Sequence, residues 1–121
     1  MLLAAAFTHT ACVRSGSLSD GLGIAVEVTP TIPLVGRVST IEATLTDRDK
    51  PIVGAKLQIE AHMLHPGMAP VMAPAVERST GVYAARLTLP MAGDWVIYVA
   101  GELPGGRRIH QKVDVLVRPV N

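Results

Sequence analysis

The chain has 121 residues, enough for one domain with a single hydrophobic core. Its formal net charge is +1 and it has no basic run, so the overall charge does not attract it to nucleic acid or to an anionic membrane. Nucleic acid is therefore not an expected partner. No stretch of about 18 or more apolar residues is present, so no transmembrane segment is expected. Only 3% of the residues are aromatic, so Val, Ile, Leu and Ala must build most of the core.

The N-terminal sequence MLLAAAFTHTAC is an apolar run that ends in small residues and in the single cysteine, Cys12. Such a run is typical of an export signal, and a lone cysteine directly after it resembles the lipid-acceptor cysteine of bacterial lipoproteins. The alternatives are an ordinary signal peptide without lipidation and a frayed tail with an unpaired thiol. We therefore expect residues 1–19 to be a leader with a flexible lead-in, and residues 20–121 to form the domain.

From residue 24 onward, hydrophobic residues alternate with polar or small ones, a period of two that is typical of strands packed on one side. The segments with this alternation are GIAVEVT, TIEATLTD, KLQIEAHM, GVYAARLTL, DWVIYVAG and HQKVDVLV. A short edge strand is expected near residues 73–78, because an edge tolerates proline. Glycine and proline turns separate these segments. The sequence therefore predicts an all-β sandwich of about seven antiparallel strands in two packed sheets.

An ordered set of motifs follows the turn DRDKP: the strand KLQIEAHM, the loop HPGMAPVMAP, then GVY at 81–83 and MAGDW at 91–95. Together they resemble the YtkA-like domain family, which also includes FixH-like proteins, from Val26 to Val117. The resemblance implies an immunoglobulin-like β-sandwich that is exported to the periplasm or the outer face of a bacterial membrane. It also implies a link to copper handling or to the assembly of respiratory oxidases. The family turn usually has glycine where this chain has Lys50, so a turn with the family geometry would give Lys50 a positive φ, and the turn type stays open.

The stretch EAHMLHPGMAPVMAP, residues 60–74, concentrates histidine and methionine around a turn. Thioether sulfur is a soft ligand that favours Cu(I), and imidazole binds both oxidation states of copper. Glu60, the only nearby acid, is expected to be a solvated carboxylate, and the alternative is that it orients a histidine from the second coordination sphere. Met63 shares the alternation of Ile59 and Ala61, which favours the core. The predicted cofactor is therefore Cu(I), and its candidate ligands are His62, His65, Met68, Met72 and Met91.

Each candidate ligand also has a structural interpretation, because methionine often fills irregular cores and a histidine on a strand face is usually solvated. His110 is isolated in the sequence and is left out of the ligand set. Trp95 and Tyr83 fall on apolar strand faces and are expected in the core. No phosphate loop, catalytic triad, carboxylate pair or zinc motif is present, so the protein is not expected to be an enzyme.

Two functions are consistent with these features. The first is an exported metal-binding module that binds or delivers Cu(I) through the His/Met loop. The second is a non-catalytic interaction module that docks on a membrane or respiratory complex through the apolar, Met-rich loop. In the first, the donor side chains converge on one ion; in the second, they spread over a flat patch.

Overall fold

The computed structural model describes residues 12–15, as backbone only, and residues 21–120. These residues form nine strands and no helix, so none of them lies in a helix with the length and hydropathy of a membrane span. The strands are β1 (Cys12–Ser15), β2 (Leu22–Thr29), β3 (Val38–Asp47), β4 (Lys50–Pro51), β5 (Lys56–Met63), β6 (Val71–Ser79), β7 (Val82–Thr88), β8 (Gly93–Glu102) and β9 (Arg108–Val117). The seven expected strands are confirmed, and β1 and β4 are additional.

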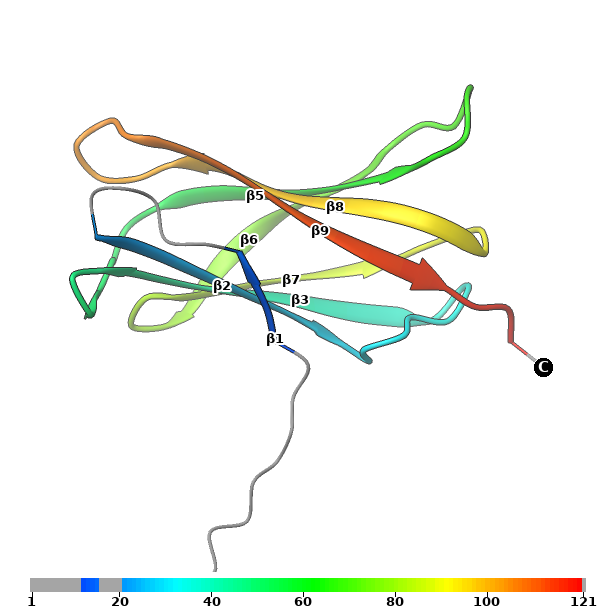
Figure 1. Ribbon diagram of the computed structural model, residues 1–121, viewed down its shortest axis with the longest axis horizontal. Helices are drawn as coiled ribbons and strands as arrows, with labels where there is room; N and C mark the ends of the chain where they lie inside the picture. Colours follow the sequence, from blue (N-terminus) through cyan, green and yellow to red (C-terminus); the bar gives the residue numbers. More distant parts are fainter. Residues whose placement is uncertain (1–11, 16–20, 121) are drawn as a thin grey trace, which may run out of the picture.

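The strands form two packed layers, with β2, β3 and β7 in one and β5, β8 and β9 in the other (Figure 1). All pairs are antiparallel in the order β1-β2-β3-β7-β6-β5-β8-β9, and β4 pairs with β3. Strand β6 joins the layers, because residues 71–75 pair with β5 and residues 76–79 pair with β7. Each half of β6 is therefore a sheet edge, the place in a sheet where a proline such as Pro74 is tolerated. The expected edge strand is confirmed, with longer bounds.

The core lies between the layers and contains the inward-facing residues of the predicted alternation. Trp95 and Tyr83 are 0% and 1% exposed, so both are confirmed as core anchors. Each of these large rings buries more apolar surface than an aliphatic side chain, so each contributes more to the stability of the core than any aliphatic residue does. The aliphatic core residues with no exposed surface include Val26, Ile41, Leu45, Ile59, Leu89, Ile97 and Val99.

The GVY motif connects β7 to the segment between β4 and β5. Gly81 has a φ of 76°, and a Cβ there would lie 2.6 Å from the Cβ of Pro51, so the position requires glycine. The Tyr83 hydroxyl donates a hydrogen bond to the Ile52 carbonyl at 2.7 Å and accepts one from the Ala55 N–H at 3.0 Å. The buried tyrosine thus satisfies two backbone groups of a segment that has few ladder partners.

The MAGDW motif connects the start of β8 to the loop that follows β5. The indole N–H of Trp95 donates a hydrogen bond to the Met91 carbonyl at 2.9 Å. The Leu64 N–H donates to the Asp94 carbonyl at 3.1 Å. The Met-rich loop therefore lies against the turn between β7 and β8.

The turn between β3 and β4 differs from the one that the family geometry implies. That geometry would give Lys50 a positive φ, but Arg48 and Asp49 adopt it, with φ values of 51° and 66°. Positive φ at both central residues is typical of a type I′ turn, whose twist matches the strands of a two-residue hairpin. The family geometry does not hold at Lys50, because Lys50 is already the first residue of β4.

Strand β1 comes from the segment that the sequence places in the leader and lead-in. Cys12 lies opposite Glu27 and Ser15 lies opposite Ile24, so β1 extends the layer of β2 by one strand. Residues 1–11 of the expected leader lie outside the described residues, as does the side chain of Cys12. Export and lipidation therefore stay predictions.

Candidate functional site

Glu60 and His62 project from the outer face of β5, because Ile59 and Ala61 occupy its inner face. The Oε1 atom of Glu60 lies 3.3 Å from the Nε2 atom of His62, and both side chains are partly exposed. A carboxylate that contacts one ring nitrogen sets the orientation of the imidazole, as it does for many metal-binding histidines. The alternative role for Glu60, to orient a histidine, thus has a geometric basis.

Two histidines flank Tyr98 on the same outer face. The ring centroids of His62 and Tyr98 are 5.5 Å apart in an edge-on arrangement, and those of Tyr98 and His110 are 4.6 Å apart in a stack. Alternation within each strand could have placed Tyr98 and His110 on the outer face. Their contact depends on the register of β8 and β9, in which Ala100 lies opposite His110. The isolated His110 of the sequence is therefore part of a continuous aromatic row.

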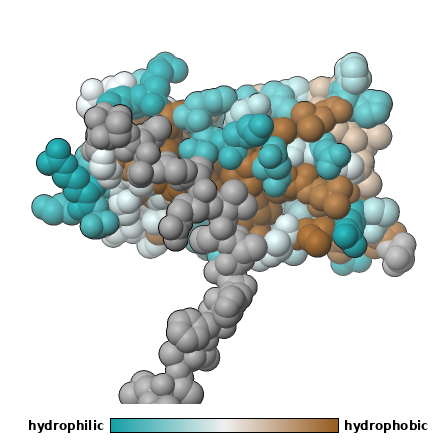
Figure 2. All heavy atoms as spheres, in the orientation of Figure 1, coloured by the Kyte–Doolittle hydropathy of each residue, from teal (hydrophilic) through white to brown (hydrophobic). Residues whose placement is uncertain are grey.

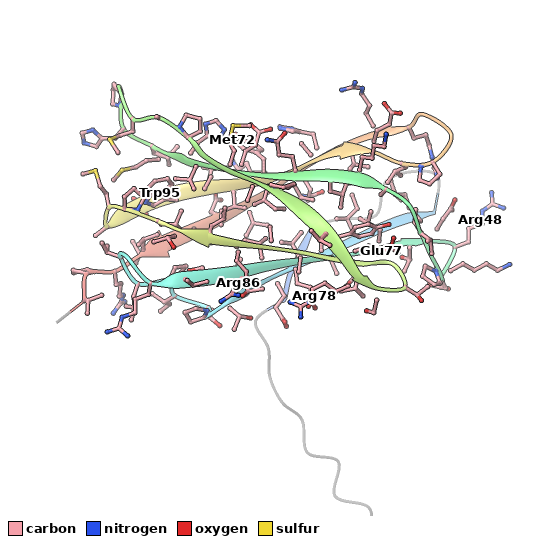
Figure 3. The ribbon with its side chains drawn as sticks, turned by 180° about the vertical axis from the view of Figure 1, so that it is seen from behind. Arg48, Met72, Glu77, Arg78, Arg86 and Trp95 are labelled. Atoms are coloured by element: carbon pink, nitrogen blue, oxygen red, sulfur yellow. The ribbon has the colours of Figure 1, made fainter. Side chains whose placement is uncertain are left out.

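Met72 lies beside Glu60 on the neighbouring strand. The two residues are directly opposite in the pairing of β5 with β6, and opposite residues project to the same face of a sheet. Met72 is 49% exposed, and Figure 3 shows it on the outer side of this layer. His62 and Met72 therefore flank Glu60, one along β5 and the other across to β6.

The three remaining candidate ligands lie at one end of the sandwich. His65 and Met68 belong to the loop between β5 and β6, and Met91 belongs to the turn between β7 and β8. His65 and Met91 are exposed, and Met68 is half-buried. The predicted donors thus fall into two groups, one on the outer face of β5 and β6 and one at the adjacent end.

Met63 projects to the opposite face from His62 and packs against the core. A Cβ at Gly93 would lie 2.9 Å from the terminal methyl carbon of Met63, so the two residues are closely packed. This confirms the expectation that Met63 is a core residue.

The donor types determine which metal would fit this surface. Within residues 21–120, no three His, Cys, Asp or Glu side chains are placed to hold a metal ion, so a site here would depend on methionine sulfur. Imidazole with thioether is a soft ligand set that suits Cu(I) and does not suit Ca²⁺ or Mg²⁺. When Nε2 of His62 carries the proton and donates to Glu60, Nδ1 keeps its lone pair for the metal. His62 and Met72 therefore fit Cu(I).

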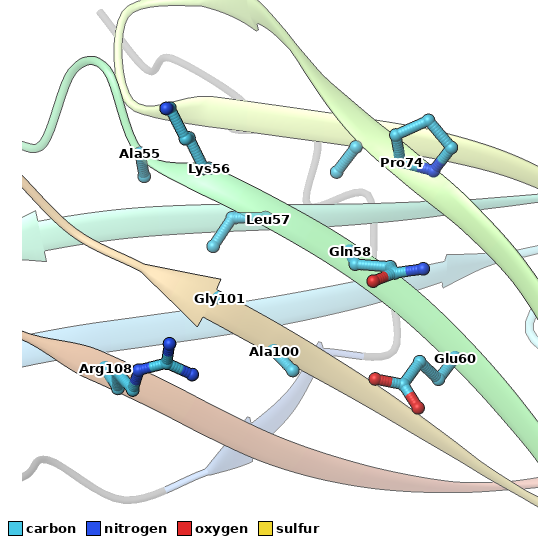
Figure 4. Close-up of a pocket in the computed structure, with 10 residues that line it drawn as sticks. Ala55, Lys56, Leu57, Gln58, Glu60, Pro74, Ala100, Gly101 and Arg108 are labelled. Atoms are coloured by element: carbon cyan, nitrogen blue, oxygen red, sulfur yellow. The ribbon is translucent and has the colours of Figure 1, made fainter.

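An open trough of about 690 Å³ continues the outer face on the other side of Glu60. Figure 4 shows Glu60 and Arg108 projecting toward Ala100 from opposite sides of the trough. A Cβ at Gly101 would collide with the Lys56 carbonyl, so the floor requires glycine. The trough places a carboxylate and a guanidinium along one surface but brings no further candidate ligand to His62.

The group at the end of the sandwich is part of a larger surface, which we name the apolar end. It comprises the segments 30–37, 64–70, 89–92 and 118–120, which meet where β2, β5, β7 and β9 finish. Its charged or titratable residues are Arg37, Arg118 and His65, and it has no carboxylate. In Figure 2 hydrophobic residues gather toward this end, at the right of the view. Its exposed large hydrophobic residues are Ile32, Leu64, Met91 and Val120, with Val38 and Leu116 in the adjoining strands.

The opposite end of the sandwich, which we name the charged end, comprises segments 47–56 and 102–108. Arg107 Nη2 lies 3.0 Å from Asp47 Oδ2 across it. Both carboxylate oxygens of Glu77 accept backbone hydrogen bonds, from the N–H of Gly54 at 3.1 Å and of Gly81 at 3.2 Å. Figure 3 shows Glu77 and Arg48 toward this end and Trp95 toward the other.

Solved structures with a similar fold share little sequence with the chain. A DUF4426 family protein from Pseudomonas aeruginosa is 14% identical with a TM-score of 0.64, and the match covers 88% of this chain and 97% of that one. The filamin domain of Lin-41 is 18% identical with a TM-score of 0.59, over 86% and 98% of the two chains. The soluble domain of PmoD from Methylocystis is 12% identical with a TM-score of 0.57, over 88% and 98%. These matches support the immunoglobulin-like sandwich that the resemblance implied.

Other matches bear on how far function can be transferred. A DUF4785 family protein from Legionella pneumophila is 12% identical with a TM-score of 0.62 over 84% of this chain, which spans only 29% of that protein's length. No curated protein matches the chain in sequence. The model of the YtkA-like family matches residues 17–100, more than half of the chain and including the GVY and MAGDW motifs. The chain therefore belongs to the YtkA-like family.

Proposed function

We propose that this protein is an exported, non-catalytic module that binds Cu(I) and delivers it to a partner at the outer face of a bacterial membrane. The observation that carries the proposal is the placement of His62 and Met72 on either side of Glu60, with Glu60 in contact with the imidazole. The apolar N-terminal segment and membership of the YtkA-like family support export.

The inner part of the site consists of His62 and Met72, on two paired strands. The loop between those strands carries His65 and Met68, which lie at the adjacent end and would have to approach this face to complete the coordination of the ion. Met91 reaches the same end of the sandwich from the turn before β8, and we expect it to contribute least to affinity. Cu(I) accepts two to four soft ligands without a strict geometry, so a half-exposed surface site of this kind is suited to transfer rather than to storage.

A Cu(I) titration of the purified protein against a competing chelator, under reducing conditions, tests the proposal. Because a thiolate is itself a soft Cu(I) ligand, all proteins carry Cys12→Ser. We expect about one bound equivalent, and at least about tenfold weaker binding when Met68→Leu and Met72→Leu are combined, since both sulfurs are lost at nearly constant volume. Glu60→Gln should weaken binding by about 10- to 100-fold through the orientation of His62.

The matched control is Val76→Leu, which changes an exposed apolar residue of the same strand without touching a donor. It should bind Cu(I) like the parent protein. Absence of Cu(I) retention by the parent protein, or equal affinity of the double variant and the control, would refute the copper proposal.

A second function is favoured by a separate observation. The apolar end exposes four large hydrophobic residues from three loops and the C-terminal tail and contains no carboxylate. Exposed apolar surfaces of this kind mark contacts with proteins or membranes. We therefore also propose that this end docks the domain at a membrane or a membrane-bound respiratory complex.

A further inference from the structure

We propose that the apolar end docks directly on an anionic lipid bilayer. Ile32 and Leu64 enter the interfacial region, and Arg37 and Arg118 contact the lipid phosphates. The inference rests on the docking function proposed above and identifies its partner. It does not depend on copper.

The fold does not require the exposed apolar side chains at this end. Leu64 is 66% exposed and Ile32 is 44% exposed, although the core beneath them is closed by Trp95 and Leu89, which are 0% exposed. Neither exposed residue fills a cavity in the domain. Their apolar surface is therefore available to a partner, and its removal from water favours association.

Backbone hydrogen bonds fix the segments that carry these side chains. The Val35 N–H donates to the Arg118 carbonyl and the Arg118 N–H donates to the Pro33 carbonyl, both at 2.9 Å. The Gly36 N–H donates to the Leu89 carbonyl at 3.0 Å. The loop 30–37 and the C-terminal tail are thus tied to each other and to the end of β7. A surface already ordered in this way loses little conformational freedom when it binds.

The four segments of the apolar end carry charges of one sign, and the nearest acid along the chain is Asp94, two residues beyond segment 89–92. Arg37 and Arg118 are exposed, His65 is exposed, and the four segments of the apolar end contain no Asp or Glu. The charged end differs in that it mixes both signs, because its two segments hold five bases and three acids. Basic residues around exposed apolar side chains complement a surface of anionic headgroups.

Strand β1 begins on the side nearer the apolar end. Strand β2 runs toward the apolar end and finishes at Thr29, and Cys12 pairs with Glu27. Cys12 is therefore the residue of β1 that lies nearest the apolar end, and the apolar residues 1–11 precede it in the chain. A single lipid chain or short apolar segment binds membranes only marginally, and stable attachment usually combines two signals. The apolar end would supply the second.

The dispersed arrangement of the apolar side chains at this end favours a bilayer over a folded protein partner. The trough of about 690 Å³ and a second cavity of about 300 Å³ beside β6 and β7 both lie away from it. Its exposed apolar residues come from separate segments of the chain. A deformable bilayer accepts such separate protruding side chains, whereas a folded protein partner requires a complementary surface.

Vesicle flotation with the full chain, free of metal and carrying Cys12→Ser, tests this inference. The vesicles contain equal parts of phosphatidylglycerol and phosphatidylcholine. We expect Ile32→Glu combined with Leu64→Glu to weaken binding at least about tenfold, because apolar contact is lost and two negative charges approach an anionic surface. Arg37→Gln and Arg118→Gln should each weaken binding about fivefold and leave binding to pure phosphatidylcholine unchanged.

The matched control is Val53→Glu combined with Val76→Glu, which replaces two exposed apolar residues away from this end with the same change in net charge. It should bind the anionic vesicles within about twofold of the parent protein. Thermal unfolding of both double variants verifies that they are folded. Equal binding by all of these proteins, or no binding by the parent protein, would overturn the inference. If Ile32→Glu with Leu64→Glu leaves vesicle binding intact but abolishes capture of a membrane protein, docking stands and the lipid partner is wrong.

Discussion

The two ends of the sandwich are built in different ways. At the charged end, side chains fix the loops: Glu77 accepts two backbone hydrogen bonds, the Tyr83 hydroxyl makes two more, and Arg107 pairs with Asp47. At the apolar end, the loops are tied mostly by backbone hydrogen bonds and by the indole N–H of Trp95. Side chains at the charged end therefore serve the fold, whereas many at the apolar end remain free.

This difference shows where binding is expected. A loop whose own side chains hold it in place can change little without a loss of stability. A loop held by backbone hydrogen bonds can carry side chains that serve binding instead of stability. The histidines and methionines of residues 62–72 and the exposed Leu64 are examples. Substitutions of side chains that hold the charged end should therefore mainly lower stability. Substitutions of exposed side chains at the apolar end should mainly weaken binding.

The largest effect is expected at Trp95, which closes the core beneath the apolar end. Trp95→Ala should lower the free energy of unfolding by about 3–5 kcal/mol, because it leaves a large cavity and removes the hydrogen bond to the Met91 carbonyl. Urea denaturation measures the loss. Met91→Ala keeps that carbonyl and serves as control, with a change within about 0.5 kcal/mol. A small effect of Trp95→Ala would mean that the backbone hydrogen bonds alone hold this end.

An intermediate effect is expected at Glu77, at the charged end. Glu77→Ala should cost about 1.5–3 kcal/mol, because the N–H groups of Gly54 and Gly81 lose a charged acceptor. The neighbouring exposed Arg78→Ala is the control, and both are compared by thermal unfolding. If the two substitutions lower the free energy of unfolding equally, side-chain hydrogen bonds are not what stabilises the charged end.

The smallest effect is expected at the ion pair of Arg107 with Asp47, whose side chains are both partly exposed. Arg107→Ala should cost no more than about 1 kcal/mol, and the difference should shrink as salt screens the pair. Arg37, which forms no ion pair with any residue that the structure describes, is the control at the apolar end. A cost of Arg107→Ala that does not change with salt would assign its role to packing of the alkyl chain.

Most of the fold could be predicted from local pattern. The alternation in KLQIEAHM predicts β5 with its observed bounds, because every second residue of that segment must enter the core. Strand β1 was missed, because its four residues lack alternation and depend on β2 for pairing. The family resemblance placed the positive φ at Lys50 rather than at Arg48 and Asp49, since the register of a hairpin depends on which strand pairs form.

The candidate site was predictable in composition but not in arrangement. Soft donors in residues 60–74 are visible in the sequence, and alternation separates His62 from Met63. That Met72 would stand beside Glu60, and that Tyr98 would lie between His62 and His110, depends on pairing between strands far apart along the chain. The same holds for the apolar end, whose segments are dispersed over residues 30–120.

The sequence by itself determined the strands, the composition of the core and the presence of soft metal donors, because each follows from residues within one short segment. Only the tertiary structure decided that the donors divide between a sheet face and an adjacent end, and that one end is apolar and the other charged. Strand register and the crossing of β6 between the layers set these neighbours. They depend on the packing of the whole chain, since each strand finds its position only against the others.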